Sequence, residues 1–253
     1  MFVQSSNLKN QKISDIVGND YRYAKALDSF GVDFYKYSDY QIEDICKIKG
    51  FKKESLIGYR ISLDESFDLE HDSLKSCPLN LVVEYLKHNH NYFIKNKLPY
   101  IKNLIQNLDT SNINYKFSDD LKFIFPSFYE EFTEHILEEE TIIFQYINKL
   151  FYADHNSQNL SLLFFSMKEI SLKNIAEEHL NEDSEMSGIR GLTKNYSLNN
   201  IKNLHLKVIF QELKEFDKEL EIHSNIENKI LFPRALKLQD KISNELRNIS
   251  FLN

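Results

Sequence analysis

One short motif occurs twice in this chain, and it restricts which folds the chain can adopt. The first copy, residues 135–144, reads HILEEETIIF, and the second, residues 223–232, reads HSNIENKILF. In each copy a His stands four residues before a Glu, and the copy ends with an aliphatic pair and a Phe. Residues four apart lie on the same face of an α-helix, and imidazole together with carboxylate binds iron, manganese or zinc. We therefore expect two helices that present matching His/Glu pairs to a shared interior.

A single pair of this kind carries less weight, because long polar helices contain His-x-x-x-Glu by chance. Such a pair is commonly exposed and contributes only a few tenths of a kcal/mol to helix stability. Two pairs in matching context favour a metal site over two unrelated surface pairs.

The composition favours an all-α protein. Gly (6) and Pro (4) are scarce among the 253 residues, whereas Leu, Ile, Lys, Glu and Asn are plentiful, which suits long helices with short connections. A chain of this length forms one large or two smaller domains. The net charge of −7 disfavours a nucleic-acid partner.

The sequence also predicts a soluble, cytoplasmic protein. Cys46 and Cys77 are too few for a disulfide framework, so a reducing compartment is expected. The first seven residues lack the charged and apolar regions of a signal peptide. No apolar run approaches the ~20 residues of a membrane span, so no membrane partner is expected.

Four long amphipathic segments predict an up-down four-helix bundle, whose interior commonly holds metal sites. The first begins at Pro78, and the others cover residues 119–151, 159–180 and 197–229. Apolar residues at three- and four-residue steps mark each segment. The inward stripe of the second segment comprises Ile124, Phe128, Phe132, His135, Glu139, Ile142, Tyr146 and Leu150. A further apolar stripe covers residues 236–246.

Prolines mark expected interruptions of these helices. Pro99 is expected to kink the first long helix, and Pro126 to lie in the first turn of the second. Pro233 is expected to kink or end the fourth. Residues 181–198 are either a loop or a broken helix that crosses one end of the bundle.

Residues 1–62 predict a small helical domain. Its helical patterns cover residues 13–17 and 21–30, and a later one runs from Lys53 or Ser55 to Ile61. Another includes Ile42, with Ser38 and Asp39 as caps. Gly31 and Gly50 stand where helices end. Residues 63–76 are then a polar linker, residues 77–240 the bundle, and residues 241–253 a tail.

Each long helix carries a histidine on its inward stripe. Unpaired buried carboxylates and imidazoles are costly, so six such groups in one core require cations. Two iron or manganese ions bridged by two carboxylates meet this requirement. The expected ligands are His90, His135, Glu139, His179, His223 and Glu227. On the first helix, His88 and Asn91 compete with His90.

The remaining polar residues receive weaker assignments. The histidines expected on the surface are His71, His155 and His205. Three glutamates, Glu138, Glu140 and Glu178, either orient the imidazoles from outside the ligand set or are solvated. The sequence contains no Gly-rich phosphate loop, no Gly-x-Ser-x-Gly and no Cys-x-x-Cys.

These motifs resemble those of the bacterial iron–sulphur cluster repair di-iron proteins, also called regulators of cell morphogenesis and NO signalling, whose C-terminal domain is hemerythrin-like. Residues 223–235 are similar to the last-helix motif of that family, and residues 135–144 to its second-helix motif. Glu178-His179 resembles its third-helix site, and His90, ahead of Leu98-Pro99, its first-helix ligand. The resemblance covers nearly the whole chain.

The N-terminal region resembles the same family only in part. Residues 31–34, GVDF, are similar to the family's Gly-x-Asp-Phe, but Tyr35 and Lys36 stand where the family has paired cysteines. Cys46 fits the family's single downstream cysteine. Thiol chemistry that depends on the paired cysteines is therefore not carried over to this chain.

The resemblance implies two oxo-bridged non-haem irons, a homodimer, and a role in restoring iron–sulphur clusters damaged by nitric oxide or peroxide. Damaged iron–sulphur proteins are then the expected partners. The irons would bind or reduce NO, or iron would be released to a damaged cluster, and whether the site turns over as an enzyme stays open.

Two alternatives remain. One is a hemerythrin-like protein that binds or senses O2 or NO without turnover. A pure carrier does not need the N-terminal domain, whereas a repair factor can use it to dock on a client. The other is a metal-free helical interaction protein, in which the six inward polar groups are structural.

Overall fold

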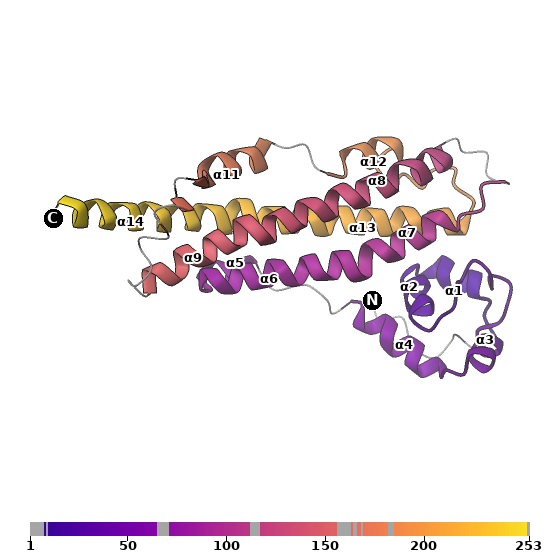
Figure 1. Cartoon of the computed structure of the whole chain (residues 1–253). Coiled ribbons are helices and arrows are strands. Elements are labelled where there is room, and N and C mark those ends of the chain that lie inside the picture. Colours follow the sequence, from indigo (N-terminus) through magenta and orange to yellow (C-terminus); the bar gives the residue numbers. More distant parts are fainter. Residues whose placement is uncertain are drawn as a thin grey trace.

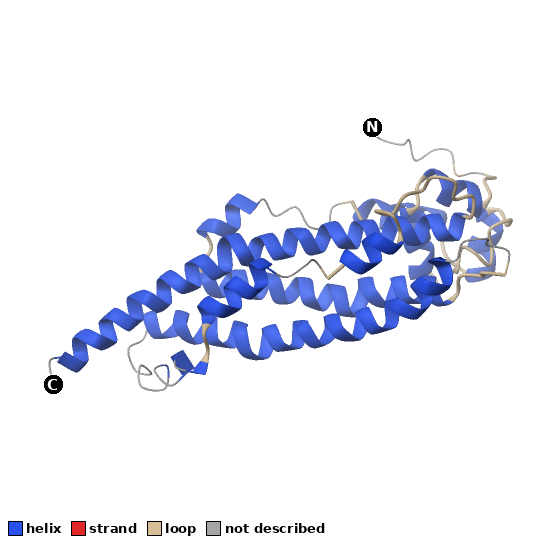
Figure 2. Cartoon of the chain, turned by 90° about the horizontal axis from the view of Figure 1, so that it is seen from above, coloured by secondary structure: helices blue, strands red, loops and turns tan. Residues whose placement is uncertain are grey.

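The structure, a computed structural model, describes residues 10–64, 71–111, 117–155, 169–181 and 185–251, together with residues 8, 163, 166 and 167. The predicted all-α class is confirmed, because the regular elements in these ranges are helices and no strand occurs there (Figures 1 and 2). The nearest approach to a sheet is one isolated antiparallel bridge between Lys12 and Gln41. None of the described helices has the length and apolar character that crossing a membrane requires.

Three long helical rods lie side by side (Figure 1). The first joins α6 (Leu79–Tyr92), the π-helical turn η1 (Phe93–Lys97) and α7 (Leu98–Gln106). The second joins α8 (Phe117–Glu138), η2 (Glu139–Ile143) and α9 (Phe144–His155). The third joins α13 (Leu204–Ile226), η4 (Glu227–Leu231) and α14 (Phe232–Phe251).

The third predicted helix, residues 159–180, is not one continuous element among the described residues. Residues 170 and 171 interrupt it, and only α11 (Leu172–Asn181) follows as a defined helix. Within the segment expected as a loop or broken helix, α12 (Ser187–Leu192) forms a short helix. In Figure 1 these two helices lie along the third rod, and α11 contacts α14 while α12 contacts α8.

Prolines interrupt the rods less than expected. Pro99 and Pro233 each lie at the start of an α-helix directly after a π-turn, so the rod continues through both. A wider π-turn gives the proline ring room and tolerates its missing N–H, which would otherwise break the helix. Pro126 lies inside α8 and not in its first turn, so that prediction was wrong.

Buried apolar side chains form two clusters along the rods. The first apolar cluster includes Phe93, Ile136 and Leu220, and the second includes Leu86 and Ile143. Along each rod, the sequence passes from one cluster to the other through a few polar residues. The boundary between the two clusters is therefore where polar side chains enter the core.

The N-terminal region forms four short helices, as predicted. They are α1 (Ile13–Asn19), α2 (Arg22–Ser29), α3 (Ile42–Lys49) and α4 (Lys53–Ser62). Gly31 (φ +70°) and Gly50 (φ +74°) adopt left-handed conformations where helices end, which suits glycine. The predicted caps were wrong, because Gln41 precedes α3 without a side-chain cap and Asp39 pairs with Lys12 at 3.3 Å.

The N-terminal region packs on the bundle formed by the three rods through aromatic and charged contacts. The ring of Tyr35 stacks on His205 of α13 with centroids 4.1 Å apart, and the Lys25 ammonium lies 4.0 Å from the ring centroid of Tyr100. His205 is 7% exposed, so its predicted surface position was wrong. The stacking partner comes from a distant part of the chain, which periodicity does not reveal.

Three smaller predictions also differ from the structure. Within the expected linker, α5 (His71–Ser76) is helical, and within the expected tail, α14 continues to Phe251. The second predicted helix, expected to end at residue 151, continues to His155 at the end of α9. The division into domains itself stays a prediction.

Candidate metal centre

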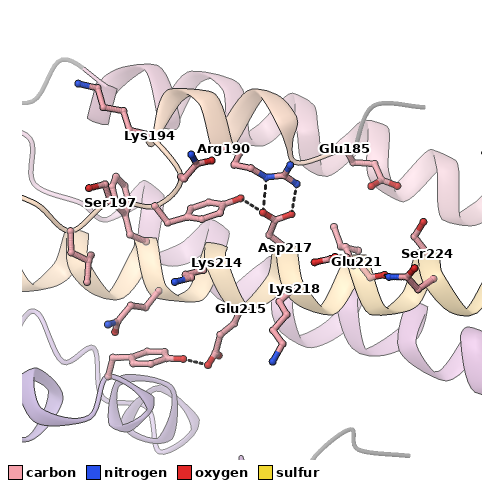
Figure 3. A pocket seen from close by; sticks show the side chains of 18 of the residues that line it. Glu185, Arg190, Lys194, Ser197, Lys214, Glu215, Asp217, Lys218, Glu221 and Ser224 are labelled. Atoms are coloured by element: carbon pink, nitrogen blue, oxygen red, sulfur yellow. Dashed lines mark hydrogen bonds and ion pairs between the residues drawn. The ribbon is translucent and has the colours of Figure 1, made fainter. Parts of the chain in front are cut away.

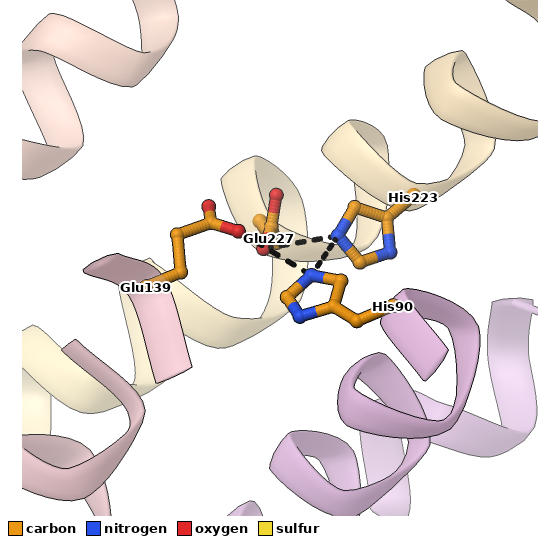
Figure 4. Close-up of side chains that lie close together, drawn as sticks. All are labelled: His90, Glu139, His223 and Glu227. Carbon is orange, nitrogen blue, oxygen red and sulfur yellow. Dashed lines mark hydrogen bonds and ion pairs between the residues drawn. The ribbon is translucent and has the colours of Figure 1, made fainter. Parts of the chain in front are cut away.

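Four buried side chains from three rods meet at the boundary of the two apolar clusters (Figure 4). They are His90 of α6, Glu139 of η2, His223 of α13 and Glu227 of η4. The Nε2 atoms of His90 and His223 lie 2.9 Å apart. His90 Nε2 lies 3.3 Å from Glu139 Oε2, and His223 Nε2 lies 3.3 Å from Glu227 Oε1.

A second group shares Glu139 with the first. His179 Nε2 of α11 lies 2.9 Å from Glu139 Oε1, and His135 Nε2 of α8 lies 3.4 Å from the same oxygen. Glu139 thus offers one carboxylate oxygen to each group. A shared carboxylate is the arrangement that bridges two neighbouring metal ions.

The duplicated motif has a duplicated local structure. In both copies the Glu opens a π-turn of five residues, and the next α-helix begins at the terminal Phe. Phe144 stacks on the ring of His90, with centroids 5.4 Å apart, and Phe232 lies 5.1 Å from the ring of His179. The terminal Phe of each copy therefore packs on a histidine from a different helix.

The surrounding protein groups shift the pKa values of the two buried carboxylates in opposite directions. Burial alone would raise the pKa of Glu139, but the imidazoles of His135 and His179 lower that pKa well below its usual range. Burial, followed by the negative charge of Glu139, raises the pKa of Glu227 well above its usual range. A cation between the two carboxylates would favour the ionised form of both.

The histidines also differ from one another in the direction of their pKa shifts. Contact with Glu139 raises the pKa of His135 to about 9, whereas burial lowers the pKa of His223 to about 4. A metal ligand must present a neutral imidazole nitrogen. His223 is therefore already in the ligating form, and a metal ion at the second group must displace a proton from His135.

The contacts fit metal coordination better than hydrogen bonding. Glu139 Oε1, His179 Nε2 and Glu227 Oε1 are buried and have no hydrogen-bond partner in the described part of the chain. His179 Nε2 and Glu139 Oε1 nevertheless lie only 2.9 Å apart, so two atoms that can both bind a metal ion lie side by side. Between His90 and His223 only one of the facing nitrogens can donate a proton. A cavity of about 20 Å³ lies among these groups, which suffices for a water-sized species.

All six predicted ligand residues are thus brought together. On the first helix the cluster residue is His90, because His88 and Asn91 are exposed. Glu140 lies 3.0 Å from His90 Nδ1 and so holds that ring from outside the cluster. The other two glutamates considered for this role, Glu138 and Glu178, are exposed.

One residue near the site escaped the sequence analysis. Glu185 precedes α12, and its Oε1 lies 3.9 Å from His135 Nε2. Residue 185 belongs to an irregular connection, where helical periodicity assigns no face. The sequence contains no signal that would have singled it out.

A groove whose walls include His179 and Glu185 reaches the second group, and Figure 3 shows the side chains that line much of it. It has a volume of about 1430 Å³ and runs between α13 and the connection that carries α12. The groove and the small cavity share His179, Glu185, Leu220 and Ser224 in their walls. The second group is therefore the side of the cluster that solvent species can approach.

A scan against models of known protein families and a search of curated proteins both found no match. The case for a metal centre therefore depends on the geometry and chemistry of these six side chains.

Proposed function

We propose that this protein is a hemerythrin-like di-iron protein that protects or repairs iron–sulphur clusters damaged by nitric oxide or oxidants. The observation that carries the proposal is the pair of adjacent donor groups joined through Glu139. Four imidazoles and two carboxylates match the preference of iron for mixed nitrogen and oxygen ligands. Such a set does not resemble the thiolate-rich sites of structural zinc.

In this proposal each iron has its own pair of histidines. His90 and His223 would hold one iron, His135 and His179 the other, and Glu139 and Glu227 would bridge them. A pair of irons held in this way supplies redox chemistry toward small ligands such as NO and O2. Around the first group the surrounding residues exclude bulk water, since its four side chains are buried where both apolar clusters meet.

The role in cluster repair comes from the motif resemblance and not from the geometry. The packing of the N-terminal helices on the bundle is compatible with a domain that presents a client to it. Tyr35, which stands where the family has a cysteine, packs on His205, so this chain would repair clusters without paired thiols. The resemblance also predicts a homodimer, which light scattering on the purified protein tests.

Metal content tests the central part of the proposal. Because the site offers six donor side chains, we expect about two irons per chain after anaerobic loading with iron(II). After exposure to air the protein should show near-ultraviolet oxo-to-iron absorption. Glu227→Ala and His135→Ala should lose the absorption and at least one iron. His88→Ala is the matched control, because His88 is exposed on the same helix as His90. Absence of stoichiometric metal in the wild-type protein would contradict the proposal and favour a metal-free interaction protein.

The repair role is separated from simple ligand binding by a second measurement. An iron–sulphur enzyme inactivated with NO should recover activity when iron-loaded wild-type protein is added, but not with Glu227→Ala. If the wild type binds NO or O2 and restores no activity, the protein is a carrier or sensor. That outcome would keep the di-iron centre and overturn the repair function.

A further inference from the structure

The two donor groups are not equivalent. The four side chains of the first group are all buried. In the second group the side chains of His135 and His179 are 30% and 11% exposed, and this is the group that the groove reaches. The first group supplies two histidines and two carboxylates, whereas the second is identified with only three residues.

Glu185 stands at the open side of the second group. Its Oε1 atom lies 3.9 Å from His135 Nε2, and its side chain is 40% exposed. Two donor atoms that bind one ion at ~2.1 Å each are at most about 4.2 Å apart. Glu185 and His135 are therefore already close enough to share an ion, and the Glu185 side chain is not confined by full burial; Figure 3 shows it in the wall of the groove.

We infer that Glu185 is a further ligand of the second metal position, and that this position is the one whose ion exchanges with solvent through the groove. This inference rests on the proposed di-metal site and deepens it. A carboxylate in the wall shared by the small cavity and the groove can hold a divalent cation when no other ligand is present. It can also swing away when an exogenous ligand arrives or when the ion leaves.

The surroundings of Glu185 favour this role over a purely structural one. The acidic groups farther along the groove are placed differently: Asp217 is held by Arg190 at 2.8 Å, and Glu221 lines the groove but not the small cavity. Glu185 is the groove carboxylate that also lines the small cavity beside Glu139. An ion at the second position thus meets Glu185 on its way in or out.

Iron release from the full-length protein tests the inference. Wild-type protein loaded anaerobically with iron(II) is mixed with a chromophoric iron(II) chelator. We expect two phases of about equal amplitude, a fast one from the exposed position and a slow one from the buried position. His179→Ala should remove the fast phase, which assigns that phase to the second position.

The Glu185 variants then give the decisive result. Glu185→Ala should accelerate the fast phase by at least about tenfold, the effect typical of losing a carboxylate at a metal site, and leave the slow phase unchanged. Glu185→Gln should have an intermediate effect, since an amide oxygen is a weaker, neutral donor. Glu221→Gln is the matched control in the same groove and should release iron like the wild type.

The outcomes separate this inference from the proposed function. Two bound irons with identical release from wild type and Glu185→Ala would overturn the role of Glu185 and leave the di-iron site intact. Acceleration of both phases would also overturn it, because the effect would not be confined to one position. A wild type that binds no iron would instead contradict the di-iron proposal itself. The slow phase in each variant serves as the check that the bundle has folded.

Discussion

Lys97 lies in the core of the bundle with only 5% of its side chain exposed. Burial alone would lower its pKa, but neighbouring carboxylates, Glu212 first among them, raise the pKa above its ordinary value. The ammonium lies 3.2 Å from Glu212, 3.6 Å from Glu215 and 3.5 Å from Glu219. Lys97 therefore balances a group of acidic side chains on one face of α13.

Replacing this lysine should strongly destabilise the protein. In Lys97→Met the side chain keeps its length, but the buried Glu212 loses its ion partner. Breaking a buried pair in this way costs about 3–5 kcal/mol, which urea unfolding at pH 7 measures. The loss should shrink as the pH falls, because burial raises the pKa of Glu215 to about 7 and also raises the pKa of Glu219, so these two neighbours lose their negative charge first.

A surface pair provides the control for Lys97. Lys87 lies 3.5 Å from Glu84, and both side chains are substantially exposed. Lys87→Met should therefore change the free energy of unfolding by less than about 1 kcal/mol. If the two substitutions lowered the free energy of unfolding equally, burial would not strengthen the stabilising ion pairs of Lys97.

At the scale of single residues, the sequence predicted the cluster well because its members fall on apolar stripes. His135, Glu139, His223 and Glu227 also carry the duplicated motif, which made them distinctive. Glu185 was missed because it belongs to an irregular connection where helical periodicity assigns no face. His205 was missed because its partner Tyr35 lies far away in the chain, in a contact between distant segments. Local patterns contain no information about such contacts.

The π-turns are the elements that set the position of the cluster. Each rod has one, and η2 and η4 begin at Glu139 and Glu227 themselves. A π-turn contains one residue more than an α-turn, so it rotates the residues within it relative to the flanking helix. Such turns are frequent at functional sites.

Deleting one residue from a π-turn should separate folding from metal binding. Removal of the exposed Thr141 from η2 leaves an ordinary α-turn, and α8 and α9 keep their buried faces. We expect cooperative thermal unfolding to be retained, whereas metal affinity falls at least about tenfold because Glu139 moves. Circular dichroism during heating and metal titration measure the two effects.

A deletion in an ordinary α-turn is the control for this experiment. Removing the exposed Glu131 from α8 rotates one half of the rod against the other by about 100°. Buried residues such as Phe128 and Phe144 then cannot both face the core, so cooperative unfolding should be lost. If the Thr141 deletion binds metal like the wild type, the π-turn does not position Glu139.

At the scale of elements, the predictions were best where the helical period is regular. The predicted stripe of the second rod included Ile124 and Ile142, but both are exposed. Ile124 lies at the edge of the apolar face of α8, and Ile142 lies in the π-turn, where a period of 3.6 no longer applies. The third helix was predicted as continuous because periodicity alone does not reveal the break at residues 170 and 171.

For the whole molecule, the sequence predicted a helical N-terminal region followed by long helices, but not how the two pack together. The first apolar cluster contains residues of both, such as Leu27 and Phe210. Tyr21, the residue before α2, also donates a hydrogen bond from its hydroxyl to Glu215 of α13. The N-terminal helices and one end of the bundle therefore share a core.

This shared core should make stability depend on pH through His205. Burial lowers the pKa of His205 to about 4, compared with its ordinary value of 6.5. Below pH 6.5 the unfolded chain binds a proton at this residue that the folded protein does not bind until near pH 4. The contribution of His205 to stability is therefore complete above pH 6.5 and is lost as pH falls, by up to about 1.4 kcal/mol per pH unit.

His205→Gln removes this titration and isolates it from the other histidines. Urea unfolding of both proteins at pH 7 and pH 5 gives the difference in unfolding free energy, in which titrations common to both cancel. From the linkage slope, we expect the unfolding free energy of the wild type, relative to that of His205→Gln, to fall by about 2 kcal/mol between pH 7 and pH 5. The exposed His88→Gln should show no such change. A wild-type advantage that stays constant with pH would mean that His205 binds protons alike in both states, which is incompatible with a neutral imidazole packed between Tyr35 and the bundle.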